Sequence, residues 1–160
     1  MTIKVGDRLP AATLATMTAD GPDQVQLPDA FLGQKVALFC VPGAFTPTCS
    51  ARHLPGFVDK ADALKAKGID RIVGLAVNDV FVMDAWGKTA DVGDKVLLLA
   101  DGNAAFVKAL GLELDASGYG MGMRGKRFSM VVNDGVVEQL NVEEGGEYRV
   151  SSAEHLLATL

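Results

Sequence analysis

The chain has 160 residues, of which 49% are hydrophobic and 22% charged, and its net charge is −5. This length suits one domain over residues 1–160, and this composition favours a packed core over a disordered chain. An acidic chain without basic runs is not expected to bind nucleic acid or an anionic membrane, because both select clustered Lys and Arg. The longest apolar stretch, Val36–Phe45, is broken by Pro42 and Gly43 and falls short of the ~18 residues of a membrane span.

The first expected elements along the chain are short. Two strands are predicted at Ala12–Thr16 and Val25–Leu27, and a brief helix follows around Asp29–Leu32. Continuous apolar runs of strand length come next, at Lys35–Cys40, Arg71–Val77 and Lys95–Ala100. Such runs are typical of strands that are buried on both faces and covered by helices.

Helical patterns lie between and after these runs. Apolar residues spaced i, i+3, i+4 and i+7 predict a helix over residues 54–64. A second helix is predicted at Val80–Trp86, where Asn78-Asp79 offers a cap. A third is predicted at Ala104–Leu110, with Gly111 as its terminating glycine.

The C-terminal part predicts a hairpin and a last helix. Phe128–Val132 and Val136–Val142 flank Asn133-Asp134-Gly135, a strong hairpin signal. Ser151-Ser-Ala-Glu154 has the spacing of a capping box at the start of a helix. A βαβ unit followed by ββα indicates an α/β protein with a thioredoxin-like fold, in which helices flank a central mixed sheet.

The sequence contains two cysteines, Cys40 and Cys49. Two are too few for a disulfide scaffold or a four-thiolate zinc site. The start of the chain, Met1–Arg8, is mixed and charged and has no apolar block like that of a signal peptide, so a cytoplasmic location is expected. In a reducing compartment, each cysteine is either an inert core residue or a reactive one.

The segment around Cys49 favours a reactive cysteine. Thr46 is a good N-cap and Pro47 suits the first helical position, which puts Cys49 at the third position of a helix. Unpaired backbone N–H groups and the positive end of the helix dipole stabilise an anion there, so the pKa of the thiol is expected to fall below ~8.5. Cys49, His53 and Phe57 are spaced by four and share one helix face.

These residues resemble a known family. Pro42-x-x-x-Thr46-x-x-Cys49 is similar to the active-site signature of the peroxiredoxins, and Val41–Ser50 resembles the peroxiredoxin-5, or type II, subfamily in particular. The resemblance runs from about Val5 to the C-terminus. Its other matching segments are His53–Phe57, Val77–Asp79 with Trp86, Leu99–Asp101 and Arg127–Met130.

The resemblance implies a thiol peroxidase that needs no metal and no organic cofactor. Cys49 would attack hydrogen peroxide or an organic hydroperoxide and become a sulfenic acid. Thr46 would hydrogen-bond the peroxide and the thiolate, and Pro42 would shield the sulfur from water. Arg127 would stabilise the thiolate and the charge that develops on the oxygens. Arg124 and Lys126 lie close by in sequence, and Arg127 is preferred because Arg-Phe-Ser-Met fits the family pattern.

Other residues have simpler interpretations. Cys40 lies within an apolar strand and is expected to be structural, although a resolving or regulatory role stays open. His53 is expected to pack or to hydrogen-bond, with a role as base as the alternative. Trp86 and Phe45 are core residues by default, and the resemblance also suggests Phe45 for a homodimer interface. Gly118–Gly122 lacks the context of a phosphate loop and is predicted to be a flexible loop.

The sulfenic acid must be reduced to complete a catalytic cycle. Some members of the subfamily use a second cysteine near the C-terminus, where this chain has Tyr148–Ser152 instead. We therefore expect a one-cysteine mechanism in which glutathione, glutaredoxin or thioredoxin is the reductant, with Cys40 as the sole internal alternative.

Three other functions are compatible with parts of the sequence. A disulfide reductase or glutaredoxin usually carries Cys-x-x-Cys or Cys-x-x-Ser, whereas this chain has Cys49-Ser-Ala-Arg52. A redox sensor or holdase would share the first chemical step and is not excluded. A Cys–His acyl-transfer enzyme would have to use His53 or His155, and neither has a clear orienting partner in the sequence.

Overall fold

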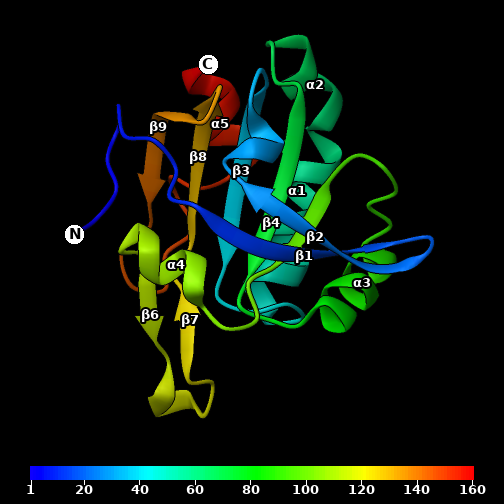
Figure 1. The fold of residues 1–160 in the computed structure, drawn as a ribbon, viewed down its shortest axis with the longest axis vertical. Coiled ribbons are helices and arrows are strands. Elements are labelled where there is room, and N and C mark those ends of the chain that lie inside the picture. The colour runs from blue at the N-terminus through cyan, green and yellow to red at the C-terminus, as the bar shows by residue number, and fades with distance from the viewer.

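The chain folds around a mixed sheet, as predicted (Figure 1). The computed structural model describes residues 1–48 and 50–160 and, for Cys49, its place at the start of one helical turn. The central strands β3, β4 and β5 are parallel, and the outer strands pair antiparallel. In spatial order, the seven strands described in this sheet are β2 (Gly21–Leu27), β1 (Ala12–Thr18), β5 (Leu97–Ala100), β4 (Arg71–Ala76), β3 (Lys35–Val41), β8 (Phe128–Asn133) and β9 (Val136–Val142).

Helices cover both faces of this sheet. Four of them contribute to one buried cluster: α1 (Leu54–Asp59), α2 (Ala61–Ala66), α3 (Val80–Thr89) and α5 (Ala153–Thr159). A second cluster contains α4 (Ala105–Leu110), the short helix η1 (Asp29–Phe31) and part of the N-terminal segment. In Figure 1, α4 lies near β6 (Glu113–Asp115) and β7 (Met123–Gly125), away from α2 and α3. The continuous apolar strands of the sequence are therefore explained by burial on both sides.

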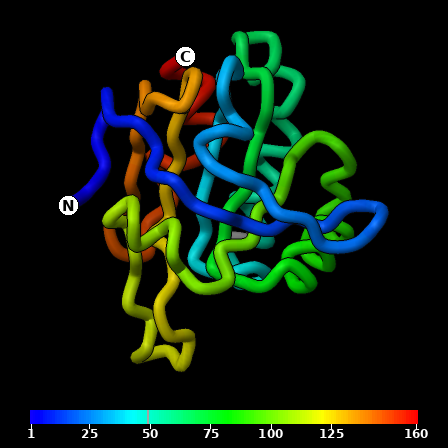
Figure 2. Tube along the Cα trace, viewed as in Figure 1, coloured from blue at the N-terminus to red at the C-terminus, as the bar shows by residue number. Residues whose placement is uncertain are grey.

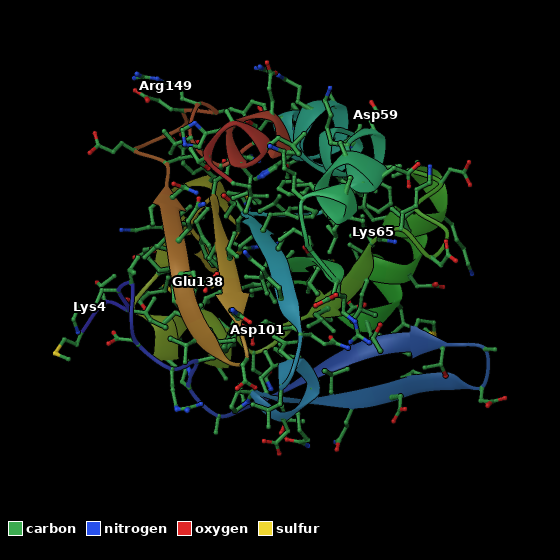
Figure 3. All side chains as sticks on the ribbon, turned by 90° about the horizontal axis from the view of Figure 1, so that it is seen from above. Lys4, Asp59, Lys65, Asp101, Glu138 and Arg149 are labelled. Carbon is green, nitrogen blue, oxygen red and sulfur yellow. The ribbon has the colours of Figure 1, made fainter. Side chains whose placement is uncertain are left out.

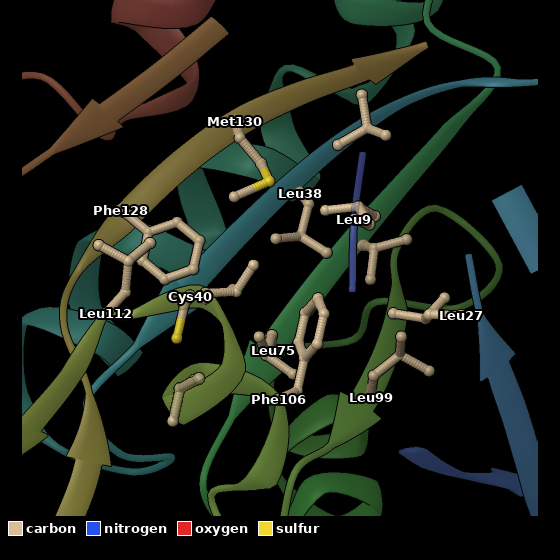
Figure 4. Close-up of a cluster of buried hydrophobic side chains, with 14 of the residues drawn as sticks. Leu9, Leu27, Leu38, Cys40, Leu75, Leu99, Phe106, Leu112, Phe128 and Met130 are labelled. Atoms are coloured by element: carbon tan, nitrogen blue, oxygen red, sulfur yellow. The ribbon is translucent and has the colours of Figure 1, made fainter. Parts of the chain in front are cut away.

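Strand β3 divides its side chains between the two clusters. Leu38 and Cys40 belong to the cluster with α4, whereas Phe39 and Val41 belong to the cluster with α1. Figure 4 shows Cys40 among apolar side chains that include Phe128 and Leu112. Cys40 is fully buried, as the apolar context of its strand predicted.

Most strand and helix predictions hold with shifted boundaries, but the helix predicted over residues 54–64 is divided at Lys60 into α1 and α2. Asp79 caps α3 by accepting a hydrogen bond from the backbone N–H of Val82 at 2.9 Å. Gly111 ends α4 with a φ of 72°, a left-handed conformation that favours glycine. The third apolar run becomes a strand at Leu97 rather than Lys95, because residues 93–95 form a turn.

The last helix begins differently from the prediction. Ser152, not Ser151, is its N-cap, and the Ser152 hydroxyl accepts a hydrogen bond from the N–H of His155 at 3.1 Å. The capping-box prediction was therefore wrong by one residue. The hydroxyl of Ser151 instead donates to Glu143 at 2.6 Å, and that distant partner gave no local signal in the sequence.

A small hairpin was missed. Strands β6 (Glu113–Asp115) and β7 (Met123–Gly125) pair antiparallel, and η3 (Ser117–Tyr119) lies between them. The segment Gly118–Gly122, predicted as a flexible loop, forms most of the tip of this hairpin. Figure 1 shows that it extends beyond the end of the main sheet. Strands of three residues are too short to give a period-2 pattern.

Figure 2 shows that the two ends of the chain lie apart from each other at the surface. Within the described residues, we find no helix of the length and apolarity that crossing a membrane requires. Among the same residues, no three His, Cys, Asp or Glu side chains are grouped so that they would hold a metal ion.

Gly125 gives a test of the packing around Cys40. A Cβ atom at this position would lie 2.6 Å from Cys40 Sγ and 3.0 Å from a Val107 methyl. Gly125→Ala is therefore expected to lower the free energy of unfolding by about 1–3 kcal/mol, measured by urea denaturation. In a Cys40→Ala background the same substitution should cost less. Gly118→Ala is the matched control, because its Cβ would meet nothing within 4 Å.

Candidate active site

The candidate site begins where the central parallel strands end. β3 ends at Val41, where the loop with Pro42 and Thr46 begins, and β4 ends at Ala76, shortly before Asn78 and Asp79. This edge of a parallel sheet is where α/β proteins place their ligands. Pro42, the first predicted site residue, is half-buried directly after β3. Thr46 follows on the same loop, and Arg127 directly precedes β8, the antiparallel neighbour of β3.

Neighbouring elements hold this loop by hydrogen bonds. The N–H of Ala44 donates to Asn78 Oδ1 at 2.9 Å, which ties the loop to the segment after β4. The indole N–H of Trp86 donates to the hydroxyl of Ser50 at 3.0 Å, which ties it to α3. Two separate parts of the chain therefore fix the residues on both sides of Cys49.

The β6–β7 hairpin closes another side of the loop. Arg124 donates from Nη1 to the carbonyl of Val77 at 3.0 Å and from Nε to the carbonyl of Met121 at 2.9 Å. A Cβ on Gly43 would lie 3.3 Å from Arg124 Nη1 and 3.3 Å from the Met121 methyl. Gly43 thus lets the hairpin approach the loop closely, a contact that the sequence gave no means to find.

Phe45 combines an unusual backbone with an exposed ring. Its φ is 65°, in the left-handed region, which costs a non-glycine residue about 1–2 kcal/mol. Its side chain is 50% exposed, so the default prediction of a core residue was wrong, whereas Trp86 is buried as predicted. Strain of this kind persists where surrounding contacts over-determine the backbone, and it clusters at functional sites.

Thr46 starts the helical segment through its backbone. Its carbonyl accepts a hydrogen bond from the N–H of Ser50 at 2.9 Å. Its hydroxyl donates to the carbonyl of Gly43 at 2.7 Å. Because the hydroxyl proton is used in this way, Thr46 Oγ1 can only accept further hydrogen bonds, either from a helix N–H or from a ligand O–H.

The predicted nucleophile begins the next element. Cys49 is the first residue of η2 (Cys49–His53), a π-helical turn that leads directly into α1. Single π-helical turns are frequent at functional sites. The side chain of Cys49 lies outside the described residues, so its predicted thiolate stays a prediction.

His53, at the end of the same turn, is buried and makes two hydrogen bonds. Its Nε2 lies 2.9 Å from the carbonyl oxygen of Ser151, and its Nδ1 lies 2.9 Å from Arg127 Nη1. A carbonyl only accepts and a guanidinium only donates, so Nε2 carries the proton and Nδ1 is the acceptor. His53 is thus a packing and hydrogen-bonding residue, as predicted, and this arrangement requires a neutral imidazole.

The surroundings of His53 maintain that neutral form. Burial, together with the positive charge of Arg127, lowers the pKa of His53 from 6.5 to about 3. The imidazole packs near the rings of Phe39, Phe57 and Tyr148, with centroid distances of 5.0, 5.7 and 5.2 Å. These rings exclude water and make the imidazolium unfavourable.

Glu143 connects Arg127 with Ser151, the residue whose carbonyl holds His53. The N–H of Glu143 donates to the carbonyl of Arg127 at 3.0 Å. Its Oε2 accepts hydrogen bonds from the N–H groups of residues 149–151 and from the Ser151 hydroxyl, at 2.6–2.9 Å. Burial raises the pKa of Glu143, but the hydrogen bonds from Ser151 and its neighbours outweigh burial and lower it overall. The carboxylate therefore fixes the loop whose carbonyl holds His53.

The three basic residues close in sequence occupy different places. Arg127 contacts His53, within the turn that begins at Cys49, while Arg124 braces the hairpin against the residue after β4. Lys126 is exposed. The structure thus brings Arg127 and η2 together, which spacing alone did not indicate. Glu143 and Ser151 were missed as site residues because nothing in their local sequence links them to Arg127.

Known proteins resemble this chain over nearly its full length. The Redoxin family model matches residues 4–157. Peroxiredoxin-2E-2, chloroplastic, of Oryza sativa subsp. japonica is 51% identical over 99% of this chain and 73% of its own. The crystal structure of reduced Prx3 in complex with H2O2 from Vibrio vulnificus shares 50% identity with a TM-score of 0.95 and covers 99% of both chains.

The chain belongs to the peroxiredoxin family. It is therefore a peroxidase among the oxidoreductases. Its likeness to the type II and peroxiredoxin-5 branch, expected from the sequence, also holds. The crystal structure of peroxiredoxin 5 from Alvinella pompejana is 34% identical, with a TM-score of 0.86 over 98% of this chain and 97% of its own.

The lowered pKa of His53 predicts a pH dependence of stability. The native state holds a neutral imidazole, whereas the unfolded chain takes up a proton below about pH 6.5. The stabilisation is thus complete above pH 6.5 and is lost as the pH falls toward 3. Relative to His53→Gln, the wild type should lose about 2 kcal/mol of unfolding free energy between pH 7 and pH 5.

Urea denaturation at each pH measures this difference. His155→Gln is the matched control, since it removes the chain's other histidine and should keep the wild-type pH dependence. Parallel pH profiles for the wild type and His53→Gln would contradict the buried neutral imidazole.

Proposed function

We propose that this peroxiredoxin reduces hydrogen peroxide and alkyl hydroperoxides with Cys49 as the nucleophile. The observation that carries the proposal is the Arg127–His53 hydrogen bond, because it ties a guanidinium to the helical turn that begins at Cys49. The Cys49 thiolate attacks the terminal peroxide oxygen, an S–O bond forms and the O–O bond breaks. An alcohol or water leaves after protonation, and Cys49 becomes a sulfenic acid.

The other site residues have separate roles in this proposal. Arg127 stabilises the thiolate and the negative charge that develops on the leaving oxygen. Thr46 accepts the hydrogen bond of the peroxide O–H, a role supported by the use of its own proton on Gly43. Pro42, half-buried after β3, shields the reacting sulfur from water. All of them act within one thioredoxin-like domain over residues 1–160.

We infer a one-cysteine cycle. Cys40 belongs to the buried cluster on the face of α4, whereas η2 continues into α1, whose apolar residues belong to the cluster on the opposite face. A disulfide with Cys49 needs Cα atoms within about 7 Å and converging side chains, so β3 would have to be rearranged. An external thiol, glutathione or the active-site thiol of glutaredoxin or thioredoxin, therefore reduces the sulfenic acid through a mixed disulfide.

The cycle takes place in a reducing compartment, which we propose is the cytoplasm. Such compartments keep thiols reduced, as this recycling requires. The name of the rice relative contains the word chloroplastic, so family membership alone does not fix the location. Fractionation with an antibody against the chain would test it, and recovery outside the cytoplasm would refute this part of the proposal.

Peroxide consumption tests the chemical assignments. Hydrogen peroxide and an alkyl hydroperoxide are supplied with glutathione and glutaredoxin, and separately with thioredoxin. Cys49→Ser should abolish consumption, and Cys40→Ala should retain it. Arg127→Ala is expected to slow the peroxide step by about 10²–10³-fold, the usual cost of removing one donor to a developing oxyanion.

Lys126→Ala is the control for Arg127→Ala, because it removes an exposed neighbouring cation and should react at the wild-type rate. Continued consumption by Cys49→Ser would refute the nucleophile. Loss of turnover with every thiol in Cys40→Ala, with Cys49 still oxidised normally, would refute the one-cysteine cycle.

We also infer that two copies of the chain associate near the active site. The ring of Phe45 is 50% exposed on a strained part of the site loop, and Phe81 at the start of α3 is 66% exposed. Large exposed aromatic rings are favoured at the centre of protein interfaces. A homodimer that covered Phe45 would bury the ring and support the strained backbone of the loop.

Phe45→Glu tests this interface. It is expected to weaken the dimer at least roughly thirtyfold, the usual cost of losing an aromatic hot spot, measured as a Kd by analytical ultracentrifugation. Leu32→Glu is the control, since Leu32 is 49% exposed and precedes β3 rather than following it. A monomeric wild type, or equal Kd values for all three proteins, would refute the proposed interface.

A further inference from the structure

An open groove lies beside the helical turn that begins at Cys49. It has a volume of about 440 Å³, and its walls come from η2, α1, α5 and the loop before α5. Arg52 of η2 and Lys60, just after α1, line one side, and Tyr148 and Arg149 line another. Figure 3 shows Arg149 at the outer edge of the molecule, next to α5. None of these groups has a role in the peroxide step proposed above.

The charge of this groove opposes the charge of the whole chain. Three cationic side chains line it, Arg52, Lys60 and Arg149, against one carboxylate, Glu154. The chain as a whole carries a net charge of −5. Arg149 also contacts Glu147 at 3.3 Å, but these side chains are 76% and 50% exposed, and such surface pairs bind weakly. The positive charge of the groove therefore favours the binding of anions.

One of these cations is held in place. The guanidinium of Arg52 lies over the ring of Tyr148, 4.5 Å from its centroid. The hydroxyl of Tyr148 donates to the carbonyl of Arg52 at 3.3 Å. A cation with a fixed position loses less conformational freedom when it binds a carboxylate. The groove thus contains an oriented cation at the end that belongs to η2.

The distance to Cys49 suits a small peptide. Arg52 and Cys49 belong to the same turn, η2, and are three residues apart, so their backbones lie within about 11 Å of each other. An extended tripeptide spans roughly 10 Å. A thiol in the middle of such a peptide reaches Cys49 while a terminal carboxylate reaches Arg52 or Lys60.

We propose that this groove binds the carboxylates of glutathione and so positions its thiol at the oxidised Cys49. The inference rests on the proposed one-cysteine cycle and assigns its reductant a site. Glutathione has two carboxylates and one ammonium group, which match the three cations and the single acid of the groove. The thiol attacks the sulfenic acid, an S–S bond forms, the S–O bond breaks and water leaves. A second glutathione thiolate then releases Cys49 as thiolate and forms glutathione disulfide.

The test compares thiols of different charge. Cys49 is oxidised with one equivalent of hydrogen peroxide, and formation of the mixed disulfide is followed by rapid quenching and mass spectrometry. The thiols are glutathione, neutral 2-mercaptoethanol and cationic cysteamine. The variants are Lys60→Glu with Arg149→Glu, and Lys60→Gln with Arg149→Gln. Arg52 is left unchanged because it belongs to η2.

In the double Glu variant, the rate with glutathione should fall roughly tenfold relative to 2-mercaptoethanol, and the rate with cysteamine should rise. The rate of the double Gln variant with glutathione should lie between those of the wild type and the double Glu variant. About 1 M salt should remove the differences, since the Debye length is then only ~3 Å. Lys108→Glu in α4, on the opposite face, is the control for a charge reversal outside the groove and should behave like the wild type.

If the ratio of the glutathione rate to the 2-mercaptoethanol rate is the same in the wild type and the double Glu variant, and peroxide oxidises Cys49 normally, the proposed glutathione site is wrong. The proposed function would then still stand. A charge effect seen only when glutaredoxin is added would also overturn the glutathione site, because the surface would then serve a protein partner. Failure of the wild type to form a sulfenic acid at Cys49 would overturn the proposed function and the groove together.

Discussion

The hydrogen bond between Arg127 and Nδ1 of His53 links the core to the candidate site. The imidazole accepts it because Nε2 carries the proton and donates to Ser151. The neutral form of the imidazole is maintained by burial against Phe39 and Phe57, which are core residues of β3 and α1. Apolar packing thus determines the protonation state of His53, and this state determines where the guanidinium lies. A change in the core near His53 is therefore also a change in the site.

The choice of an imidazole as partner has an electrostatic consequence. A carboxylate in that position would orient Arg127 but also add an opposing charge, whereas a neutral His53 orients it without one. The nearby carboxylate of Glu143 is used differently, since its Oε2 accepts from three backbone N–H groups and the Ser151 hydroxyl. It stabilises the loop behind His53. His53 thus orients Arg127, and Glu143 stabilises the loop that holds His53.

Local features of the sequence predicted most of the fold, and they placed the predicted nucleophile in a helical segment. The apolar runs became β3, β4 and β5, and Asn133-Asp134-Gly135 formed its hairpin turn. The contacts of Glu143 with residues 149–151 were not predictable, because a buried carboxylate has no periodic signature. Ser151 illustrates the limit: its spacing to Glu154 favoured a cap, but Glu143 competed for its hydroxyl and Ser152 became the cap. The β6–β7 hairpin was likewise too short to detect, although it packs directly on the site loop.

The hydrogen bond from Trp86 to Ser50 has a practical consequence. The chain contains one tryptophan, and its indole N–H is bonded to the residue that follows Cys49. Any rearrangement of η2 that moves Ser50 changes the hydrogen bonding and polarity around this ring. The tryptophan fluorescence of the protein therefore originates from a single residue, which is hydrogen-bonded to the neighbour of the predicted nucleophile. A change at the site that moves Ser50 can therefore be followed in the native chain, without a label.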